Sequence, residues 1–502
     1  MRGWRSTLLQ QLARRGALRG EAPACVGDAL QLNYTALLAH VADVAASWSE
    51  MPVLGLAMDN SPQWVALDLA ALEAGKVMIP LPGFFSAEQL AHSIRDAGIG
   101  VLLTDQPAHY ASVLASAGIG VGAAQSRQVG ELTWFELPLL NIAPRPLPPG
   151  TVKVTYTSGT TGHPKGVCLG EKALFQVAQS LLAATAGVPE DRHLCVLPLA
   201  TLLENLAGVY VPLLAGATCH VPSLATVGLS GSSGLEVGKL LASLLRTAAT
   251  STILTPQLLH AIVAAVDAGH PAPRSLRFVA LGGAPVAERL LRRAEALGLP
   301  VYEGYGLSEC ASVVALNTPV ARQVGSVGKP LSHAQVQFAE DGEILVAGAT
   351  LLGYTGDMPQ AAGSYWRTGD IGHLDAAGFL HITGRKKNIF ITAFGRNVSP
   401  EWVESELTLH PAIAQAAVFG EGRAWNIALI VPRSVEALAQ VSAAIAETNR
   451  LLPDYAQIRH WLPARAPFLP QNGQMTPNGR LKRPAILAEY QTAIEAAYEQ
   501  NP

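Results

Sequence analysis

Hydroxyl residues and glycines alternate ahead of a lysine in one stretch of the chain, Val154-Thr-Tyr-Thr-Ser-Gly-Thr-Thr-Gly-His-Pro-Lys-Gly-Val167. The residues with the chemistry are Thr157, Ser158, Gly159, Thr160, Thr161, Gly162 and Lys165. Glycine permits positive φ and close backbone approach, backbone N–H groups and hydroxyls donate to phosphate oxygens, and lysine adds a point charge. The stretch therefore predicts an anion-binding loop that follows a β-prone run.

Two alternatives compete with this interpretation. A Walker phosphate loop needs glycine directly before the lysine and serine or threonine directly after it. Here Pro164 precedes Lys165 and Gly166 follows it, so the Walker pattern fails. A plain surface turn rich in small polar residues is the other alternative, but such turns seldom end in Pro-Lys-Gly beside a strand.

Further candidate residues follow the ends of predicted strands. The strand expected at 277–281 ends in Gly282-Gly283-Ala284-Pro285, and the one at 301–305 runs into Gly304-Tyr305-Gly306-Leu307-Ser308-Glu309. Strand ends of this kind open onto a ligand crevice in α/β sheets. Taken alone, Glu309 could be a first-turn helix carboxylate, and Asp370 could begin a turn.

The elements that must hold these residues alternate between strand and helix. Strands are expected at 53–58, 77–81, 101–104 and 251–255, and helices at 5–24, 61–74, 86–97 and 256–268. This alternation predicts a large α/β region of doubly wound sheets. A strand is expected at 194–199 and one buried helix at 201–215, which is apolar nearly all round except for Glu204 and Asn205.

The chain changes character after residue 325. Short alternating runs with turn signals at 325–381 predict a small β unit. The basic segment 382–388 then separates this unit from a region with strands and helices of its own. We therefore expect a large N-terminal domain over 1–384 and a smaller, mobile C-terminal α+β domain over 385–502.

Composition excludes several classes of partner. Lys and Arg number 35 against 38 Asp and Glu, so the net charge of -3 gives no field that favours nucleic acid. The five cysteines are scattered without a CxxC pair, which predicts buried thiols of a reducing compartment. No signal peptide is expected, and Glu204 and Asn205 make the apolar stretch 194–221 a poor membrane span, so the expected location is the cytoplasm.

Five segments in order resemble the motifs of the acyl-adenylate-forming (AMP-binding) superfamily, most like the fatty acyl-CoA synthetases. Besides the anion loop they are Leu281-Gly-Gly-Ala-Pro-Val286, Tyr305-Gly-Leu-Ser-Glu309, Tyr365-Trp-Arg-Thr-Gly-Asp370 and Gly384-Arg385 with Lys387. The resemblance covers 34–482 and implies an ATP-dependent carboxylic acid ligase that forms an acyl-adenylate and then an acyl thioester. A fatty acid and coenzyme A are the expected substrates. An acyl carrier protein as acceptor, or a nucleotide- or acyl-binding protein without catalysis, are the alternatives.

The resemblance also implies a role for each residue. The loop residues with Lys165 would hold the β- and γ-phosphates of ATP, Ser308 would reach phosphate, and Glu309 would bind Mg²⁺, which accepts few carboxylates. Adenine would stack on Tyr305 beside Gly283, Ala284 and Gly306, while Asp370 would accept both ribose hydroxyls, with Arg385 close by. Lys387 aligns with the hinge between the domains.

Two positions depart from the superfamily pattern. Thr201 stands where a histidine is usual beside the acyl pocket, for which Phe84, Phe85 and the 201–210 helix offer apolar walls. Arg480 stands where the superfamily has its adenylation lysine, and Lys482 follows two residues later. A guanidinium keeps the charge but is planar and bulkier. Either Arg480 serves as the catalytic cation beside Lys165 and Glu309, which we favour, or Lys482 reaches the site, or adenylation is slow.

Overall fold

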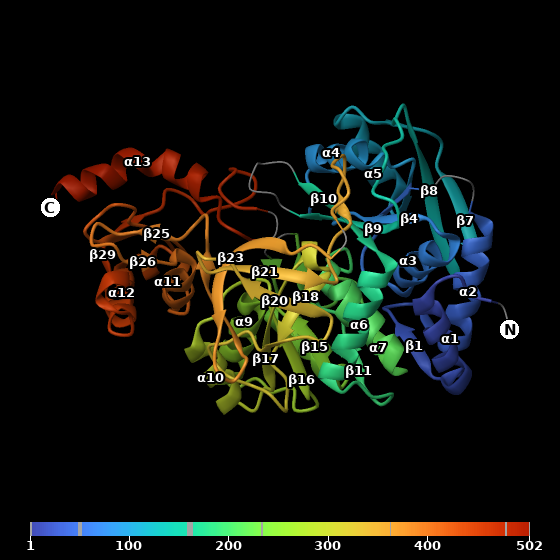
Figure 1. The fold of residues 1–502 in the computed structure, drawn as a ribbon, viewed down its shortest axis with the longest axis horizontal. Coiled ribbons are helices and arrows are strands. Elements are labelled where there is room, and N and C mark those ends of the chain that lie inside the picture. Colours follow the sequence, from blue (N-terminus) through green and yellow to red (C-terminus); the bar gives the residue numbers. More distant parts are fainter. Residues whose placement is uncertain are drawn as a thin grey trace.

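Two large sheets form the body of the molecule, which we describe from a computed structural model (Figure 1). The description covers residues 3–48, 53–157, 164–231, 234–361, 363–476 and 479–500, with Gln500 described only for its backbone. In Figure 1 the two ends of the chain lie on opposite sides, with the C-terminal region beyond residue 390 beside the rest of the molecule.

The first sheet is mainly parallel, with antiparallel strands at its edges. Its strands run in the order β19 (Lys329–Pro330), β18 (Ser312–Leu316), β17 (Val301–Leu307), β16 (Phe278–Leu281), β15 (Ser251–Leu254), β11 (Arg192–Leu194), β12 (Thr218–His220), β1 (Pro23–Val26) and β2 (Gln31–Asn33). Strands β1, β12, β11, β15, β16 and β17 are parallel neighbours. Their carboxyl ends therefore meet at one edge, where a ligand crevice forms in such sheets.

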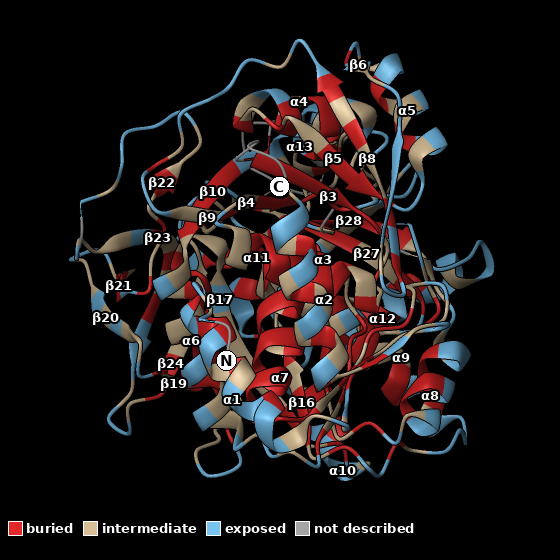
Figure 2. Cartoon of the chain, turned by 90° about the vertical axis from the view of Figure 1, so that its right-hand side faces the viewer, coloured by how far each residue is buried: buried red, intermediate tan, exposed pale blue. Residues whose placement is uncertain are grey.

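The second sheet carries the two strands that flank the anion loop. Its order is β22 (Gly353–Tyr354), β10 (Lys165–Gly170), β9 (Thr151–Thr157), β4 (Val77–Pro80), β3 (Val53–Ala57), β5 (Val101–Thr104), β8 (Leu132–Leu140) and β6 (Gly120–Val121), and β7 (Gln125–Val129) also pairs with β8. Figure 2 shows β3, β4 and β10 buried along much of their length, while α5 at the periphery is largely exposed.

Helices fill three layers around these sheets. Between the sheets lie α1 (Thr7–Arg19), α2 (Tyr34–Ser47), α3 (Pro62–Ala74), α6 (Glu171–Thr185) and α7 (Val211–Ala215). The outer face of the first sheet is covered by α8 (Val237–Arg246), α9 (Pro256–Asp267) and α10 (Glu288–Ala296). The outer face of the second sheet packs against α4 (Ala87–Ala97) and α5 (Pro107–Ser116). The predicted doubly wound α/β class is confirmed.

Smaller units complete the chain. The predicted β unit is an antiparallel sheet in the order β20 (Ala334–Phe338), β21 (Glu343–Gly348), β23 (Trp366–Leu374) and β24 (Leu380–Arg385). The C-terminal region contains β25 (Phe390–Ile391), β26 (Asn397–Val398), α11 (Pro400–Leu407), β27 (Ile413–Phe419), β28 (Asn426–Pro432), α12 (Val441–Asn449), β29 (Ile458–Pro463) and α13 (Arg483–Gln500). It has its own apolar clusters, which supports a separate domain. The boundary at residue 384 and the mobility of this domain stay proposals.

Several predicted elements differ from the structure. The helix expected at 5–24 ends at Arg19, because Gly20 caps it and Pro23–Val26 pairs with β12 as a strand. The strand expected at 194–199 is only Arg192–Leu194. The helix expected at 201–215 is interrupted by a π-helix, η1 (Glu204–Tyr210), before α7.

The π-helix supplies hydrogen-bond partners to a buried ion pair. The ammonium group of Lys153 on β9 lies 2.8 Å from a carboxylate oxygen of Asp68 on α3, and both side chains are 1% exposed. Tyr210 donates to Asp68 at 2.7 Å, and Asn205 donates to the same carboxylate at 3.1 Å. Burial lowers the pKa of Lys153, and the charge of Asp68 opposes that shift. The wide turn of the π-helix thus supplies polar partners to charges that water cannot reach.

Among the described residues, no helix combines the length and the hydropathy needed to cross a bilayer. The stretch 194–221, which is the most apolar of the sequence, is divided among β11, η1, α7 and β12 inside the fold.

Candidate active site

Asp370, Tyr305 and Arg385 lie together although they come from three strands. Register pairs Asp370 on β23 with Arg385 on β24, and the guanidinium Nε is 2.8 Å from the Asp370 carboxylate. The hydroxyl of Tyr305, on β17, donates to Asp370 at 2.6 Å. Burial raises the pKa of Asp370, while the charge of Arg385 and the tyrosine hydroxyl oppose that shift. The carboxylate is thus held at the edge where the parallel strands end.

Glu309 and Lys165 meet through a residue that the sequence did not single out, Tyr354. Its hydroxyl donates to Glu309 Oε1 at 3.0 Å, and the ammonium group of Lys165 lies 5.2 Å from the centre of its ring. Burial, followed by the charge of Glu309, raises the pKa of Tyr354. One oxygen of Glu309 thus accepts from Tyr354, and within the described part of the chain no hydrogen bond to the other oxygen is found, so it can serve a ligand such as Mg²⁺, which suits a single carboxylate.

The anion loop is fixed at both ends. Thr157 ends β9 and Lys165 begins β10, and the two residues are directly paired across the antiparallel strands. The other predicted phosphate ligands, Ser158, Gly159, Thr160, Thr161 and Gly162, lie outside the described residues. The described part therefore shows where the loop leaves and rejoins the sheet, beside Lys165 and Tyr354.

Two positions of the site, Gly283 and Gly306, require glycine for different structural reasons. Gly283, at φ 92°, follows β16, and a Cβ there would meet open space. Together with exposed Ala284 it leaves room beside Tyr305. Gly306 follows a bulge between β17 and β18, where a Cβ would lie 1.8 Å from the carbonyl oxygen of Ser312. Any side chain there would displace the turn that leads to Ser308 and Glu309.

Arg480 reaches this cluster from the C-terminal region. Its backbone is held in a turn, in which Arg480 N donates to the Thr476 hydroxyl at 3.0 Å and Thr476 N donates to the Arg480 carbonyl at 2.7 Å. Arg480 is an exposed residue, but the protein around its guanidinium still removes part of its hydration, and this together with the charge of Arg385 lowers its pKa. Attraction to Asp370 and Glu309 opposes that shift. The side chain stays cationic, because the intrinsic arginine pKa is so high.

Lys482, the other predicted cation, occupies the hairpin that leads into α13. Its backbone N–H donates to the carbonyl of Gln474 at 2.8 Å. The negative charges of Asp370 and Glu309 act on Arg480. Of the two cations, the electrostatic neighbourhood therefore favours Arg480.

A contact joins the C-terminal region to the rest of the molecule near this site. Arg289 on α10 donates to the backbone carbonyl of Glu406 on α11 at 2.6 Å and lies 3.2 Å from its carboxylate. Lys387, the predicted hinge, is exposed in the turn between β24 and β25. The adjacent Asn388 donates to Glu401 of α11. The C-terminal region thus packs on the side of the molecule that carries the strand ends.

Glu303 is a titratable residue beside the site without an assigned role. It pairs in register with Leu281, two residues before Tyr305 on the same strand. Burial, followed by the charge of Glu288, raises the pKa of Glu303 to about 8. A carboxyl group there stays protonated in the folded protein at neutral pH.

This pKa predicts a measurable change of stability with pH. Unfolded glutamate has an ordinary pKa, so the folded state binds the extra proton between about pH 4.5 and 8. Its stabilising contribution is full below that window and is lost as pH rises through 8. Because Glu303 is only partly buried, we expect the loss between pH 5 and 9 to exceed that of Glu303→Gln by about 1–2 kcal/mol. Urea unfolding at both pH values measures it, and parallel pH profiles would contradict it.

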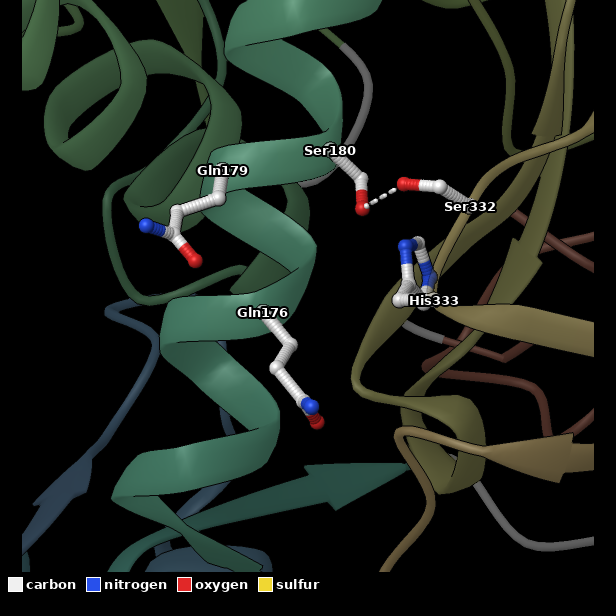
Figure 3. A pocket seen from close by; sticks show the side chains of 5 residues that line it. All are labelled: Gln176, Gln179, Ser180, Ser332 and His333. Carbon is white, nitrogen blue, oxygen red and sulfur yellow. Dashed lines mark hydrogen bonds between the residues drawn. The ribbon is translucent and has the colours of Figure 1, made fainter.

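A polar hollow in the surface is separate from the predicted site residues. It has a volume of about 230 Å³ and is lined by Gln176, Gln179, Ser180, Ser332 and His333 (Figure 3). The hydroxyls of Ser180 and Ser332 lie 2.9 Å apart, and burial lowers the pKa of His333. None of the predicted site residues lines this shallow polar hollow, so its size does not make it the reaction site.

An apolar cavity lies closer to the cluster. It has a volume of about 70 Å³ and runs between η1, α7 and the first sheet, with Leu203, Ala207 and Val211 on the helical side and Ile253, Phe278 and Ala280 on the strands. Three residues beyond Ala280 the chain reaches Gly283, a distance of about 10 Å along an extended strand. The helix was expected to form an apolar wall. Phe84 and Phe85 do not line this cavity and stack edge to face on each other instead.

A predicted anion loop between β9 and β10, a buried carboxylate bonded to a tyrosine and a C-terminal region that bears a cation are typical of a nucleotide-dependent enzyme with an α/β body. The chain belongs to the AMP-binding enzyme family, whose model matches residues 12–354, and the AMP-binding enzyme C-terminal domain matches residues 387–502. It is an acid–thiol ligase of the AMP-forming type.

Relatives with different named substrates share this architecture. A long-chain-fatty-acid–CoA ligase, FadD15 of Mycobacterium bovis, is 28% identical over 88% of this chain and 86% of its own. Feruloyl-CoA synthase of Amycolatopsis is 30% identical over 72% of this chain and 74% of its own. The anthranilate CoA ligase AuaEII, solved with anthranoyl-AMP, has a TM-score of 0.79 at 20% identity and 98% coverage of both chains. The Bacillus subtilis O-succinylbenzoate coenzyme A synthetase with ATP and magnesium ion has a TM-score of 0.72 at 23% identity, covering 94% of this chain and 98% of that one.

Proposed function

We propose that the chain joins an aliphatic carboxylic acid to coenzyme A at the expense of ATP. A carboxylate oxygen of the acid bonds to the α-phosphorus of ATP, and the bond to the bridging oxygen breaks, so that pyrophosphate leaves. The CoA sulfur then attacks the acyl carbon as its proton is lost, and AMP leaves. The held Asp370 carboxylate carries this proposal, because Arg385 at 2.8 Å and the hydroxyl of Tyr305 at 2.6 Å fix it at the strand ends, and the charges of Asp370 and Glu309 act on Arg480.

The first step brings an anion to an anion, so its barrier falls when positive charge is fixed beside the phosphates. Lys165 begins the strand after the anion loop and Arg480 closes from the other side, so both can neutralise charge that builds up on the phosphates. Asp370 would fix the ribose by charge-assisted hydrogen bonds, and Tyr305 would support the base. Mg²⁺ bound at Glu309 would supply further charge neutralisation. These roles orient the reactants and require no protein nucleophile.

The narrow cavity favours an aliphatic acid over an aromatic one. Its volume of about 70 Å³ is small against ligand pockets of about 300–1,000 Å³. On the helical side its lining extends from Leu203 to Ala215, across the whole of η1 and α7. A long and thin apolar space accepts an extended alkyl chain more readily than a ring. The relationship to the long-chain-fatty-acid–CoA ligase supports the same choice.

Pyrophosphate release across a panel of acids tests the proposal. Straight-chain fatty acids, succinylbenzoate, ferulate and anthranilate would be compared with and without CoA. We expect fatty acids to give the highest kcat/KM and an acyl-CoA product. A product that forms only with a phosphopantetheinylated carrier protein would favour the carrier alternative, and ATP binding without pyrophosphate release would favour a protein without catalysis.

Asp370→Ala should weaken ATP binding while the fold remains intact. Loss of charge-assisted hydrogen bonds to two ribose hydroxyls should reduce the binding free energy by about 2–3 kcal/mol. Isothermal titration with ATP measures this loss, and circular dichroism checks the fold. Asp375→Ala, which removes a partly exposed carboxylate that caps the neighbouring turn, is the control. An unchanged ATP affinity in folded Asp370→Ala would remove Asp370 from the nucleotide site.

A further inference from the structure

The lower end of the apolar cavity is closed by an ion pair. Strand β16 lines the cavity from Ala280 down to Arg277, which precedes the strand, and Asp191 precedes β11 at the same edge of the sheet. This edge holds the amino ends of the parallel strands, so it is opposite the strand ends that carry Gly283 and Tyr305. Figure 1 shows α6 and α7 together against this sheet, with β11 and β16 at the lower border.

The pair is held from several directions. The Nε group of Arg277 lies 2.6 Å from one oxygen of Asp191, and Nη2 contacts the other oxygen. The same guanidinium donates to the last carbonyls of α6, to Thr185 at 2.9 Å and to Ala186 at 3.3 Å. Asp191 also accepts from the backbone of Val188 at 2.9 Å. One planar cation therefore joins α6 to the amino edge of the sheet.

This pair stands between the cavity and solvent. The side chain of Asp191 is 8% exposed, whereas that of Arg277 is 35% exposed, although both line the cavity. The pair lines the cavity together with apolar residues such as Phe278 and Ala215, and its guanidinium is the more exposed of the two charged groups. An apolar chain that reached this point would have to displace the guanidinium and break charge-assisted hydrogen bonds.

We propose that the Arg277–Asp191 pair is a plug that sets the longest acyl chain the enzyme accepts. The inference rests on the proposed function, because it takes the cavity as the site of the acyl tail. Up to the plug, each further buried methylene should raise the acid's affinity about fourfold. Beyond the plug no further apolar surface is available. The kcat/KM of the acids should therefore stop rising with chain length at that point and then fall.

A purely structural role for the pair gives a different result. Arg277 also caps the end of α6, so its loss could lower stability and slow the reaction with every acid. Such a change scales all acids together and leaves their ratios unaltered. A plug changes the ratio of long to short acids. The chain-length profile of kcat/KM therefore separates the two roles.

The test compares Arg277→Ala with the wild type on saturated acids from octanoic to docosanoic, with pyrophosphate release as the readout. We expect the optimum to move to longer acids, with the kcat/KM ratio of the longest acid to decanoic acid rising about tenfold or more. Arg293→Ala is the matched control, because it removes an arginine–aspartate pair with Asp267 on the outer surface. It should leave the profile unchanged.

A second variant acts from inside the cavity and does not touch the plug. Ala207→Phe fills the space between η1 and the sheet, so the optimum should move to shorter acids. An unchanged profile in folded Arg277→Ala would overturn the plug, even if Ala207→Phe shortens the optimum. If Arg277→Ala does not fold, Arg277→Met, which keeps an unbranched side chain and removes the charge, takes its place. An optimum moved to longer acids then supports the plug, and an unchanged profile overturns it. A wild type that activates no acid of the panel would overturn the proposed function, and the plug with it.

Discussion

Arg480→Ala should slow pyrophosphate release about a hundredfold or more, with a smaller effect on ATP binding. A cation beside the α-phosphate stabilises the charge of the transition state by about 2–4 kcal/mol, and its removal raises the barrier by that amount. The structure supports this expectation because the guanidinium lies within the field of Asp370, Glu309 and Arg385. Single-turnover pyrophosphate release, measured at saturating acid and ATP, gives the rate of the chemical step.

Lys482→Ala is the matched control for that experiment. Lys482 lies two residues from Arg480 in the same hairpin, so both variants remove one positive charge from one segment. We expect Lys482→Ala to keep most of the activity. A large loss confined to Lys482→Ala would reverse the assignment. Full activity in both variants would mean that the C-terminal domain does not close over ATP in the reaction.

Lys153→Met should destabilise the protein by about 3–5 kcal/mol, because it leaves the Asp68 carboxylate buried without its cation. Urea unfolding, followed by tryptophan fluorescence, measures the loss. Lys239→Met, which removes an exposed partner of Glu236, should change stability by less than about 1 kcal/mol.

The double variant Lys153→Met/Asp68→Asn gives the sharper test of the same buried pair. It removes both charges, and the asparagine still offers an oxygen to the hydroxyl of Tyr210. We therefore expect it to recover a large part of the stability lost in Lys153→Met. If the double variant is less stable than Lys153→Met alone, the uncompensated charge is not the source of the loss.

The sequence predicted the members of the candidate site better than their contacts. The motif residues Tyr305, Asp370 and Arg385 were each expected to face the nucleotide. The contact of Asp370 with Arg385 follows from the register of β23 and β24, and the hydrogen bond from Tyr305 on β17 follows from the packing of two sheets, neither of which a local pattern reveals. Tyr354 was missed. Its signal is only an aromatic residue in the two-residue strand that pairs with β10.

Local patterns also failed where buried polar groups decide the backbone. The apolar run at 201–215 has the period of an ordinary helix, but Glu204 must reach His193 and the N–H of Leu197 inside the core. Asn205 and Tyr210 must reach Lys153 and Asp68 at the same time. Those partners are 52 and 142 residues away in sequence, so the resulting π-helix depends on tertiary structure. Residue patterns within one segment cannot show it.

The burial of the cysteines has a consequence for the handling of a reactive product. An acyl-adenylate is an electrophile that would acylate any accessible thiolate, including one on the enzyme. All five cysteines are buried, and burial raises the pKa of Cys25 and of Cys168 to about 12 and keeps Cys310, next to Glu309, protonated. The thiol of CoA therefore faces no competitor from the protein itself. A thiol-specific dye added during turnover should report the consumption of CoA alone, without a background from the folded enzyme.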